Sequence, residues 1–307
     1  MDKPFKTIDE QIAMLNLRGL STDEQTGIIL RQEGYYSVVN GYKDLFIDKA
    51  KKSAAAGDDR YKDGVEFKDI YRLFEFDRSL RSTMLKYFAI AEAKLKTACA
   101  YCFSERFKDT PEAYLDANHY RQESNYAARI QELIAHFCYT LSKDPNNKPV
   151  YKRDYMEHYV RKHDAVPLWV LFNYMDFGIV CKFFEFQKES MRNTISKYFS
   201  DFYKNTHTNS VRIYENDLRL SYDHIKEFRN ICAHDERLYC ARVSPAKDIS
   251  LSHVINKDIS KVLQERDETA MRETIANLII NLRKEMPGPF FTELFEAMGF
   301  NDLSDLL

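Results

Sequence analysis

A stripe of apolar residues runs through a long segment that contains neither glycine nor proline. Within residues 67–108, apolar side chains recur at steps of three and four: Leu73, Phe76, Leu80, Met84, Phe88, Ala91, Leu95, Ala98 and Cys102. This spacing gathers the apolar side chains on one face of an α-helix. We therefore predict one long amphipathic helix over residues 67–108.

Similar patterns predict helices on both sides of this segment. Near the N-terminus, the capping boxes Thr7–Glu10 and Ser21–Glu24 each precede a short apolar run, and Gly19 and Gly34 are typical of helix ends. No alternating pattern of convincing length indicates a strand, and residues 50–65 are expected to form an exposed loop. Further helices are predicted over residues 124–142, 151–163, 180–200, 211–240, 258–266 and 268–285.

We divide the chain into three parts that we expect to form one continuous globular unit. Residues 1–48 are an N-terminal helical segment packed on the core, residues 66–240 are the helical core, and residues 241–307 are a C-terminal helical appendage. Few residues that break helices interrupt the middle of the chain, which argues against a flexible linker. The predicted fold class is all-α, an extended helical bundle.

Composition agrees with a helical chain and excludes several classes of protein. Only 9 Gly and 8 Pro occur in 307 residues, which argues against collagen-like and turn-rich all-β folds. The 20 Tyr and 21 Phe argue against wholesale disorder. Because no apolar run reaches about 18 residues and the first residues lack an apolar signal core, we expect a cytoplasmic protein without a membrane span.

The six cysteines fall within apolar, helical patterns. Cys99 and Cys102 form a CxxC pair, which is typical of zinc sites when a second pair accompanies it. No second pair is present, because Cys232 and Cys240 are eight residues apart. We interpret the cysteines as core residues in a reducing compartment and expect no metal and no cofactor.

The sharpest chemical pattern is an arginine, an asparagine and a histidine on one predicted helix. Histidine transfers protons near neutral pH and arginine holds phosphate oxygens, so Arg229 and His234 suit cleavage of a phosphodiester without a metal. Asn230 shares a helix face with His234, whereas Arg229 is about 140° away, so Arg229 must reach around or the helix must kink or end. From spacing alone, a surface arginine and a capping or core histidine are the simpler interpretation.

Three residues of the long predicted helix are further candidates. Arg78 and Arg81 are candidates for contact with RNA, and Asp77 for support of the site. An ion pair within the helix is the simpler interpretation of residues spaced in this way.

Two other charged residues are candidates near the motif. Glu92 lies in an apolar stretch and needs a partner if it is buried, for which Arg229 is one choice. Arg237 follows His234 by three residues, so on a continuing helix it shares that face and could contact RNA.

Several aromatic and titratable residues have plainer interpretations. We interpret Tyr35, Tyr36 and Tyr42 as packing residues, with stacking on bases as the alternative. Trp169 follows a proline and is expected to anchor the core. His224 is expected to be an ordinary residue on the surface of a helix.

The chain resembles the AbiD/AbiF-type abortive infection proteins, and Arg229-Asn230-x-x-x-His234 is similar to the signature of the HEPN superfamily, an arginine followed after four to six residues by a histidine. The matching pieces occur in the family's order over roughly residues 3–240: Lys3 to Thr7, Gln11-Ile12, Leu17 to Leu20, Tyr35 to Tyr42, Phe76 to Arg81, Glu92, Val166 to Trp169 and Phe177-Gly178. Residues 241–307 carry no resemblance.

The resemblance implies a HEPN-like helical core and a role in bacterial antiphage defence. HEPN nucleases cut RNA without a metal: the 2′-OH attacks the adjacent phosphate and leaves a 2′,3′-cyclic phosphate and a 5′-OH. It implies that His234 is the acid or base, Arg229 the phosphate clamp and Asn230 an orienting group. It also implies a homodimer that acts on RNA. Because unrestrained RNA cleavage is toxic, we expect a restraint, for which a partner protein, an RNA and a phage trigger are the alternatives.

Two alternatives to a nuclease remain at this point. Because some HEPN proteins are inactive, the chain could be a non-catalytic RNA-binding or adaptor protein of a defence or toxin–antitoxin-like system. It could also be a helical scaffold whose arginine and histidine are structural.

The net charge of −2 does not decide among these hypotheses. Residues 285–307 contain five acidic and no basic side chains, and removing these five charges leaves +3 on the rest of the chain. Residues 86–108 hold five basic and two acidic side chains. Since a groove needs only local positive potential to hold a phosphate chain, RNA binding is not excluded.

Overall fold

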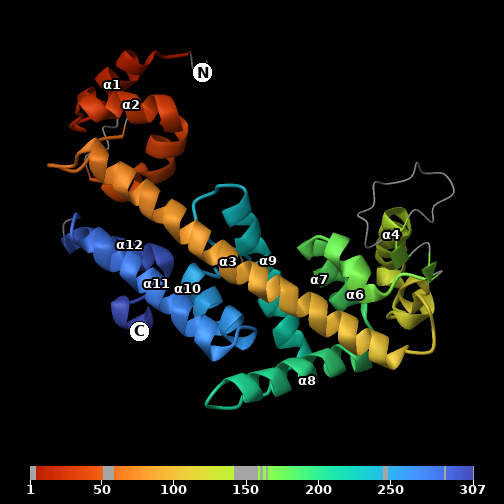
Figure 1. Ribbon diagram of the computed structural model, residues 1–307. Helices are drawn as coiled ribbons and strands as arrows, with labels where there is room; N and C mark the ends of the chain where they lie inside the picture. Colours follow the sequence, from red (N-terminus) through yellow and green to blue (C-terminus); the bar gives the residue numbers. More distant parts are fainter. Residues whose placement is uncertain are drawn as a thin grey trace.

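The computed structural model describes residues 5–50, 59–141, 158–159, 162–163, 165–244, 248–286 and 288–306. These residues form helices and connecting turns without a β-strand, which confirms the prediction of an all-α fold (Figure 1). No helix in this part of the chain has the length and apolar character needed to span a membrane. The helix predicted over residues 151–163 lies largely outside the described residues.

A single helix, α3 (Phe67–Arg106), passes through the whole molecule and organises its core (Figure 1). Its 40 residues span about 60 Å at about 1.5 Å per residue. Every member of the predicted apolar stripe is buried. The prediction of a long helix here is confirmed, with an end two residues before residue 108.

Two short helices, α1 (Ile8–Leu17) and α2 (Glu24–Glu33), lie at one end of α3 (Figure 1). The predicted capping box at Thr7 is confirmed. The predicted cap at Ser21 is wrong, because Asp23 and Thr26 form the capping box of α2. The backbone of Ser21 instead pairs with the segment before α3, where its carbonyl accepts a hydrogen bond of 2.8 Å from the Phe67 amide.

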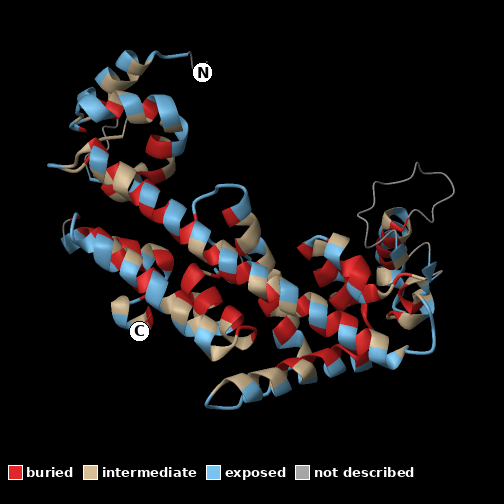
Figure 2. Ribbon diagram, viewed as in Figure 1, coloured by how far each residue is buried: buried red, intermediate tan, exposed pale blue. Residues whose placement is uncertain are grey.

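The remaining helices pack around α3. Several of them contact α3 directly, and α12 reaches the N-terminal segment, where Phe290 stacks on Phe46. Their inward faces are buried and their outward faces exposed (Figure 2). The helices are α4 (Ser124–Thr140), α6 (Leu168–Leu171), α7 (Phe177–Phe186), α8 (Glu189–Thr206), α9 (Glu215–Ala233), α10 (Leu251–His253), α11 (Glu265–Arg283) and α12 (Gly288–Met298).

Four local predictions are wrong. The single helix predicted over residues 180–200 is interrupted at Gln187 and Lys188, between α7 and α8. Residues 258–266 do not form an α-helix: the π-helical turn Val254–Asp258 and the 3-10 turn Ile259–Lys261 come before α11. Tyr61 lies in the predicted exposed loop but is buried, and residues 51–58 of that loop are outside the described residues. Trp169 is 55% exposed, because Leu168 and Leu171 fill the core in its place.

Candidate functional site

The motif residues lie at the C-terminal end of α9. The helix predicted over residues 211–240 is confirmed but is shorter than expected: it begins at Glu215, ends at Ala233 and is capped by His234. Asp235 has a left-handed backbone with φ of 58°, and the Glu236 amide donates a 3.0 Å hydrogen bond to the Ile231 carbonyl. This is a Schellman ending, which usually needs glycine but tolerates aspartate. The absence of glycine here explains why the sequence pattern suggested a longer helix.

The end of α9 decides how the motif side chains are presented. His234 is exposed, and the Arg229 side chain is 37% exposed. In the described part of the chain, neither the His234 imidazole nor the Asn230 amide has a hydrogen-bond partner, whereas the His234 backbone amide donates to the Asn230 carbonyl at 2.9 Å. The side chains of Asn230 and His234 are therefore free to meet a ligand at this end of the helix.

Arg229 is held against the long helix by Glu92. A guanidinium nitrogen of Arg229 lies 3.9 Å from the Glu92 carboxylate, which also forms a 2.8 Å ion pair with Lys96. Glu92 is largely buried, with 16% of its side chain exposed, and the packing of α3 on α9 brings it to the motif. The structure thus gives Glu92 the partner that the sequence suggested, and orients Arg229 without burying it.

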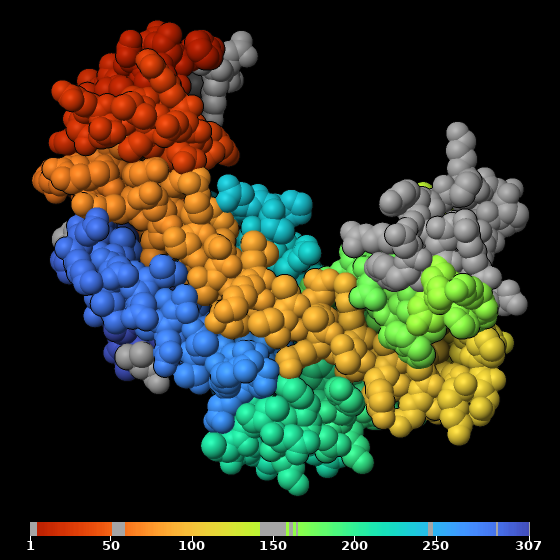
Figure 3. Space-filling view, in the orientation of Figure 1, coloured from red at the N-terminus to blue at the C-terminus, as the bar shows by residue number. Residues whose placement is uncertain are grey.

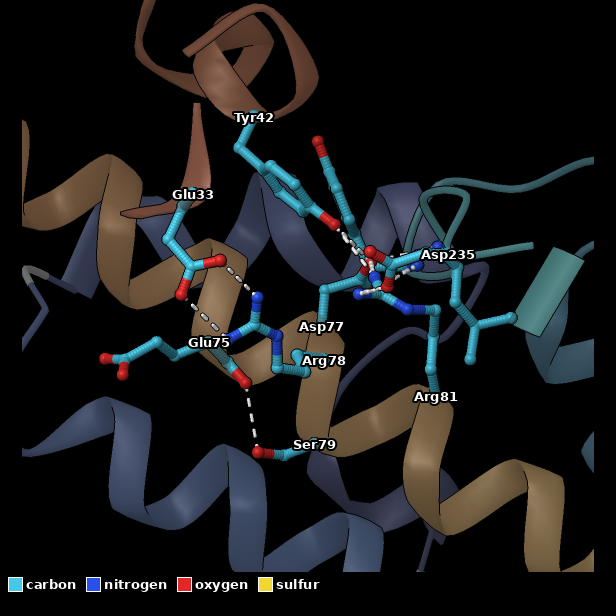
Figure 4. Close-up of polar contacts among 10 residues, drawn as sticks. Glu33, Tyr42, Glu75, Asp77, Arg78, Ser79, Arg81 and Asp235 are labelled. Atoms are coloured by element: carbon cyan, nitrogen blue, oxygen red, sulfur yellow. Dashed lines mark hydrogen bonds and ion pairs between the residues drawn. The ribbon is translucent and has the colours of Figure 1, made fainter. Parts of the chain in front are cut away.

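Asp77 fixes the segment that follows His234 (Figure 4). Its fully buried carboxylate accepts hydrogen bonds from the Tyr42 hydroxyl at 2.7 Å and from Arg81 at 2.6 Å. It also accepts hydrogen bonds from the backbone amides of Leu238 at 3.1 Å and Tyr239 at 2.7 Å. Burial raises the pKa of Asp77, and these donors, by stabilising its ionised form, oppose that rise.

Arg81 extends this network to the turn itself. One of its nitrogens contacts Asp77 and the other contacts Asp235, at 2.5 Å (Figure 4). Only 4% of the Arg81 side chain is exposed. The Arg81 guanidinium is therefore enclosed rather than at the surface, where a residue that contacts RNA was expected, and it positions the turn after His234.

The other two arginine candidates lie at the surface around the same turn. Arg78 forms a bidentate pair with Glu33 at 2.6 and 3.1 Å, and 48% of its side chain is exposed (Figure 4). Arg237 bonds to Asp44 at 2.9 Å and is 40% exposed. We expected Arg237 to share a helix face with His234, but α9 ends before Arg237, so the two residues do not share one.

A hollow of about 480 Å³ lies beside this turn. Segments 36–42 and 235–242 line it together with Phe74 of α3. Arg237 and Arg242 supply positive charge, and Asp235 and Glu236 supply an equal negative charge. Tyr42 stacks on Tyr239 and is buried, as expected for packing, whereas Tyr36 is 79% exposed at the same hollow. The end of α9 and the turn, cyan in Figure 3, lie at the surface between the N-terminal helices and α6–α7.

The CxxC pair lies in the core and not in this site. Cys99 and Cys102 are buried, and burial raises the pKa of Cys102 to about 11, so its thiol stays protonated at neutral pH. The group of three potential metal ligands that occurs within the described ranges contains no cysteine; it comprises His224, His253 and Asp258. His224 is buried rather than on the helix surface as expected.

Several partners in the site could not be found from the sequence. Asp77 meets Leu238 and Tyr239 across some 160 positions, and Asp44 is nearly 200 positions from Arg237. The only local signal was Asp235 itself, since aspartate after the last apolar residue of a helix is compatible with a left-handed ending.

The fold and the site together define an all-helical protein with an exposed arginine and histidine at the end of one helix. A family model for Abi-like proteins matches residues 28–240, more than two thirds of the chain, and the chain belongs to this family. Membership indicates a role in abortive infection defence. The match includes all of α9 and the turn after it but not residues 241–307. No curated protein and no solved structure matches the chain.

Proposed function

We propose that the protein is a metal-independent endoribonuclease of the HEPN type that acts in antiphage defence. The observation that carries this proposal is the ending of α9, where Arg229 pairs with Glu92 and the His234 imidazole is exposed with no hydrogen-bond partner among the residues that the structure describes. An exposed imidazole can exchange a proton, and a surface guanidinium can bind a phosphate.

In the proposed reaction, the 2′-OH of a nucleotide attacks its own 3′-phosphate. His234 takes or returns a proton, and Arg229 holds the non-bridging phosphate oxygens as negative charge builds up. The bond to the 5′-oxygen of the next nucleotide breaks, which leaves a 2′,3′-cyclic phosphate and a 5′-OH. Asn230, one residue from the clamp and with a free amide, orients the phosphate or the imidazole.

A homodimer completes the proposed site. Attack and departure require two proton transfers, and one chain supplies one motif histidine. A two-fold axis beside the end of α9 brings a second His234 into the same groove. Unrestrained RNA cleavage is toxic, so we propose that an inhibitory RNA or protein restrains the resting enzyme.

The hollow beside the turn supplies a path for the RNA. Arg237 and Arg242 can contact phosphates there, although Asp235 and Glu236 balance their charge, and the exposed ring of Tyr36 offers a face on which a base can stack. Arg78 lies in the same neighbourhood, although Glu33 neutralises much of its charge.

The decisive experiment is the substitution His234→Ala. RNA cleavage by the purified protein should fall by at least about 100-fold, the lower range for loss of a general acid or base. The control is His136→Ala, which removes an exposed histidine on α4, far from the motif in sequence and on another helix. Cleavage should leave 2′,3′-cyclic phosphate ends and should persist in EDTA.

The second candidate function is binding of RNA without cleavage, in the manner of an adaptor. The hollow with Tyr36, Arg237 and Arg242 favours it, because binding there does not need His234. Under this alternative, wild-type protein binds RNA but produces no cyclic phosphate ends, and His234→Ala changes nothing. If wild-type and His234→Ala protein cleave RNA equally, the nuclease proposal is wrong.

A further inference from the structure

Three polar side chains from two separate segments converge away from the motif. His224 comes from the middle of α9, His253 ends α10, and Asp258 ends the π-helical turn. Their nearest nitrogen and oxygen atoms all lie within 4.8 Å of one another. This cluster lies between the helix that carries the motif and the segment outside the family match.

One carboxylate oxygen faces both imidazoles. Asp258 Oδ2 is 2.9 Å from His224 Nδ1 and 3.7 Å from His253 Nε2. A tetrahedral zinc ion with ligands at about 2.0–2.2 Å holds its ligand atoms about 3.3–3.5 Å apart, between these two distances. The 3.7 Å between Asp258 Oδ2 and His253 Nε2 is too long for a hydrogen bond. An ion between the three atoms therefore gives His253 Nε2 a partner that the carboxylate alone does not provide.

The other carboxylate oxygen is held by a neighbour. The Ser221 hydroxyl donates a 2.8 Å hydrogen bond to Asp258 Oδ1, which leaves Oδ2 directed at the two histidines. Outer-shell hydrogen bonds of this kind orient the carboxylate ligands of metals. Lys261, 3.2 Å from the Ser221 hydroxyl, adds a positive charge behind it, so we expect moderate rather than very tight binding.

Backbone geometry explains how His253 and Asp258 come together. Residues five apart in an α-helix point about 140° away from each other. The π-helical turn Val254–Asp258 has one more residue per hydrogen-bonded ring and brings such residues onto one side. Single π-turns of this kind are frequent at functional sites.

The cluster is buried on one side and open to solvent on the other, as a site that exchanges an ion with solution requires. The side chains of His224 and Asp258 are 10% and 4% exposed, whereas that of His253 is 40% exposed. An ion can therefore enter past His253, and a water molecule can fill the fourth position. Two imidazoles and one carboxylate match zinc and similar divalent transition ions rather than calcium or magnesium.

We propose that His224, His253 and Asp258 bind one Zn²⁺ ion that joins α9 to the C-terminal segment. The ion has a structural role and takes no part in RNA cleavage, because His224 is ten residues before His234, roughly 15 Å along the helix axis. It cross-links residues that are 29 to 34 positions apart and fixes the C-terminal part of the molecule to the helix that presents the motif.

The test uses untagged, full-length protein that has been freed of metal with a chelator and then titrated with Zn²⁺. Isothermal titration calorimetry should show one ion per chain, and Co²⁺ should give the intense visible absorption of a tetrahedral site. His253→Ala should weaken Zn²⁺ binding by at least about tenfold and abolish the Co²⁺ signal. This variant is chosen because His253 is partly exposed, so its loss should not prevent folding.

The matched control is again His136→Ala, which should bind Zn²⁺ as the wild-type protein does. If wild-type and His253→Ala protein bind Zn²⁺ equally, or neither binds it, the proposal is wrong and the cluster is a hydrogen-bonded histidine–aspartate pair. The zinc proposal and the nuclease proposal can fail independently. If the nuclease proposal is right, His253→Ala protein should still cleave RNA in EDTA, whether or not the wild-type protein binds Zn²⁺.

Discussion

At the scale of single residues, Asp77 has the largest structural role in the site. It compensates the charge of Arg81 and, in a fully buried position, accepts hydrogen bonds from two backbone amides and one hydroxyl. A buried charge that loses its partner is expensive, and so is a buried amide without an acceptor. The sequence pointed to an ordinary ion pair within the helix, which exists, but not to its burial or to its hold on the turn.

We predict that Asp77→Ala lowers the free energy of unfolding by about 3–5 kcal/mol, because it leaves Arg81 and the amides of Leu238 and Tyr239 without their acceptor. Urea denaturation followed by circular dichroism measures the change. The control is Arg78→Ala, the neighbouring residue on α3, whose exposed pair with Glu33 should contribute about 1 kcal/mol or less. Equal losses for the two variants would contradict the role given to Asp77.

At the scale of elements, the ending of α9 separates what the sequence could predict from what it could not. The interior of α3 was predictable because its apolar stripe repeats without a break from Leu73 to Cys102. The end of α9 was not, because residues 234–240 contain neither glycine nor proline and the helix stops through the backbone of Asp235. The cluster around His224 was missed because a π-turn, which has no pattern of its own, aligns His253 with Asp258.

We predict that Asp235→Val destabilises the protein by about 1–2 kcal/mol more than Asp235→Asn does. Both variants lose the charge that meets Arg81, but asparagine tolerates a left-handed backbone and valine does not. The midpoints of urea denaturation for the two proteins give the difference. Coinciding midpoints would show that the left-handed conformation of residue 235 is not required.

At the scale of the whole molecule, α3 connects parts that are distant in sequence. The N-terminal helices lie at one end, α6 and α7 at the other, and α11 packs along its side (Figure 1). The three-part division of the sequence describes the order of these parts along the chain. It does not describe their packing, because each part buries its apolar face against the same helix.

We predict that Ile279→Ala on α11 lowers stability by about 2–5 kcal/mol and that the loss is felt at the far end of α3. Ile279 is fully buried, and Trp169, the single tryptophan, reports on the region of α6. The midpoint from Trp169 fluorescence should move together with the midpoint from circular dichroism.

The control for this prediction is the adjacent Ile280→Ala, which alters a residue that is 38% exposed and should have a smaller effect. A fluorescence midpoint that stays unchanged in Ile279→Ala would show that residues 241–307 unfold as a separate unit.

The hydrogen bonds between Asp77 and the turn also determine which positions of the sequence can change during evolution. The carboxylate binds the amides of residues 238 and 239, and these are present whatever side chains stand there. Positions 236 and 237, exposed between the helix end and these two anchored amides, can therefore exchange their side chains without altering the path of the backbone. Relatives can vary the surface beside the histidine in this way and keep the same frame.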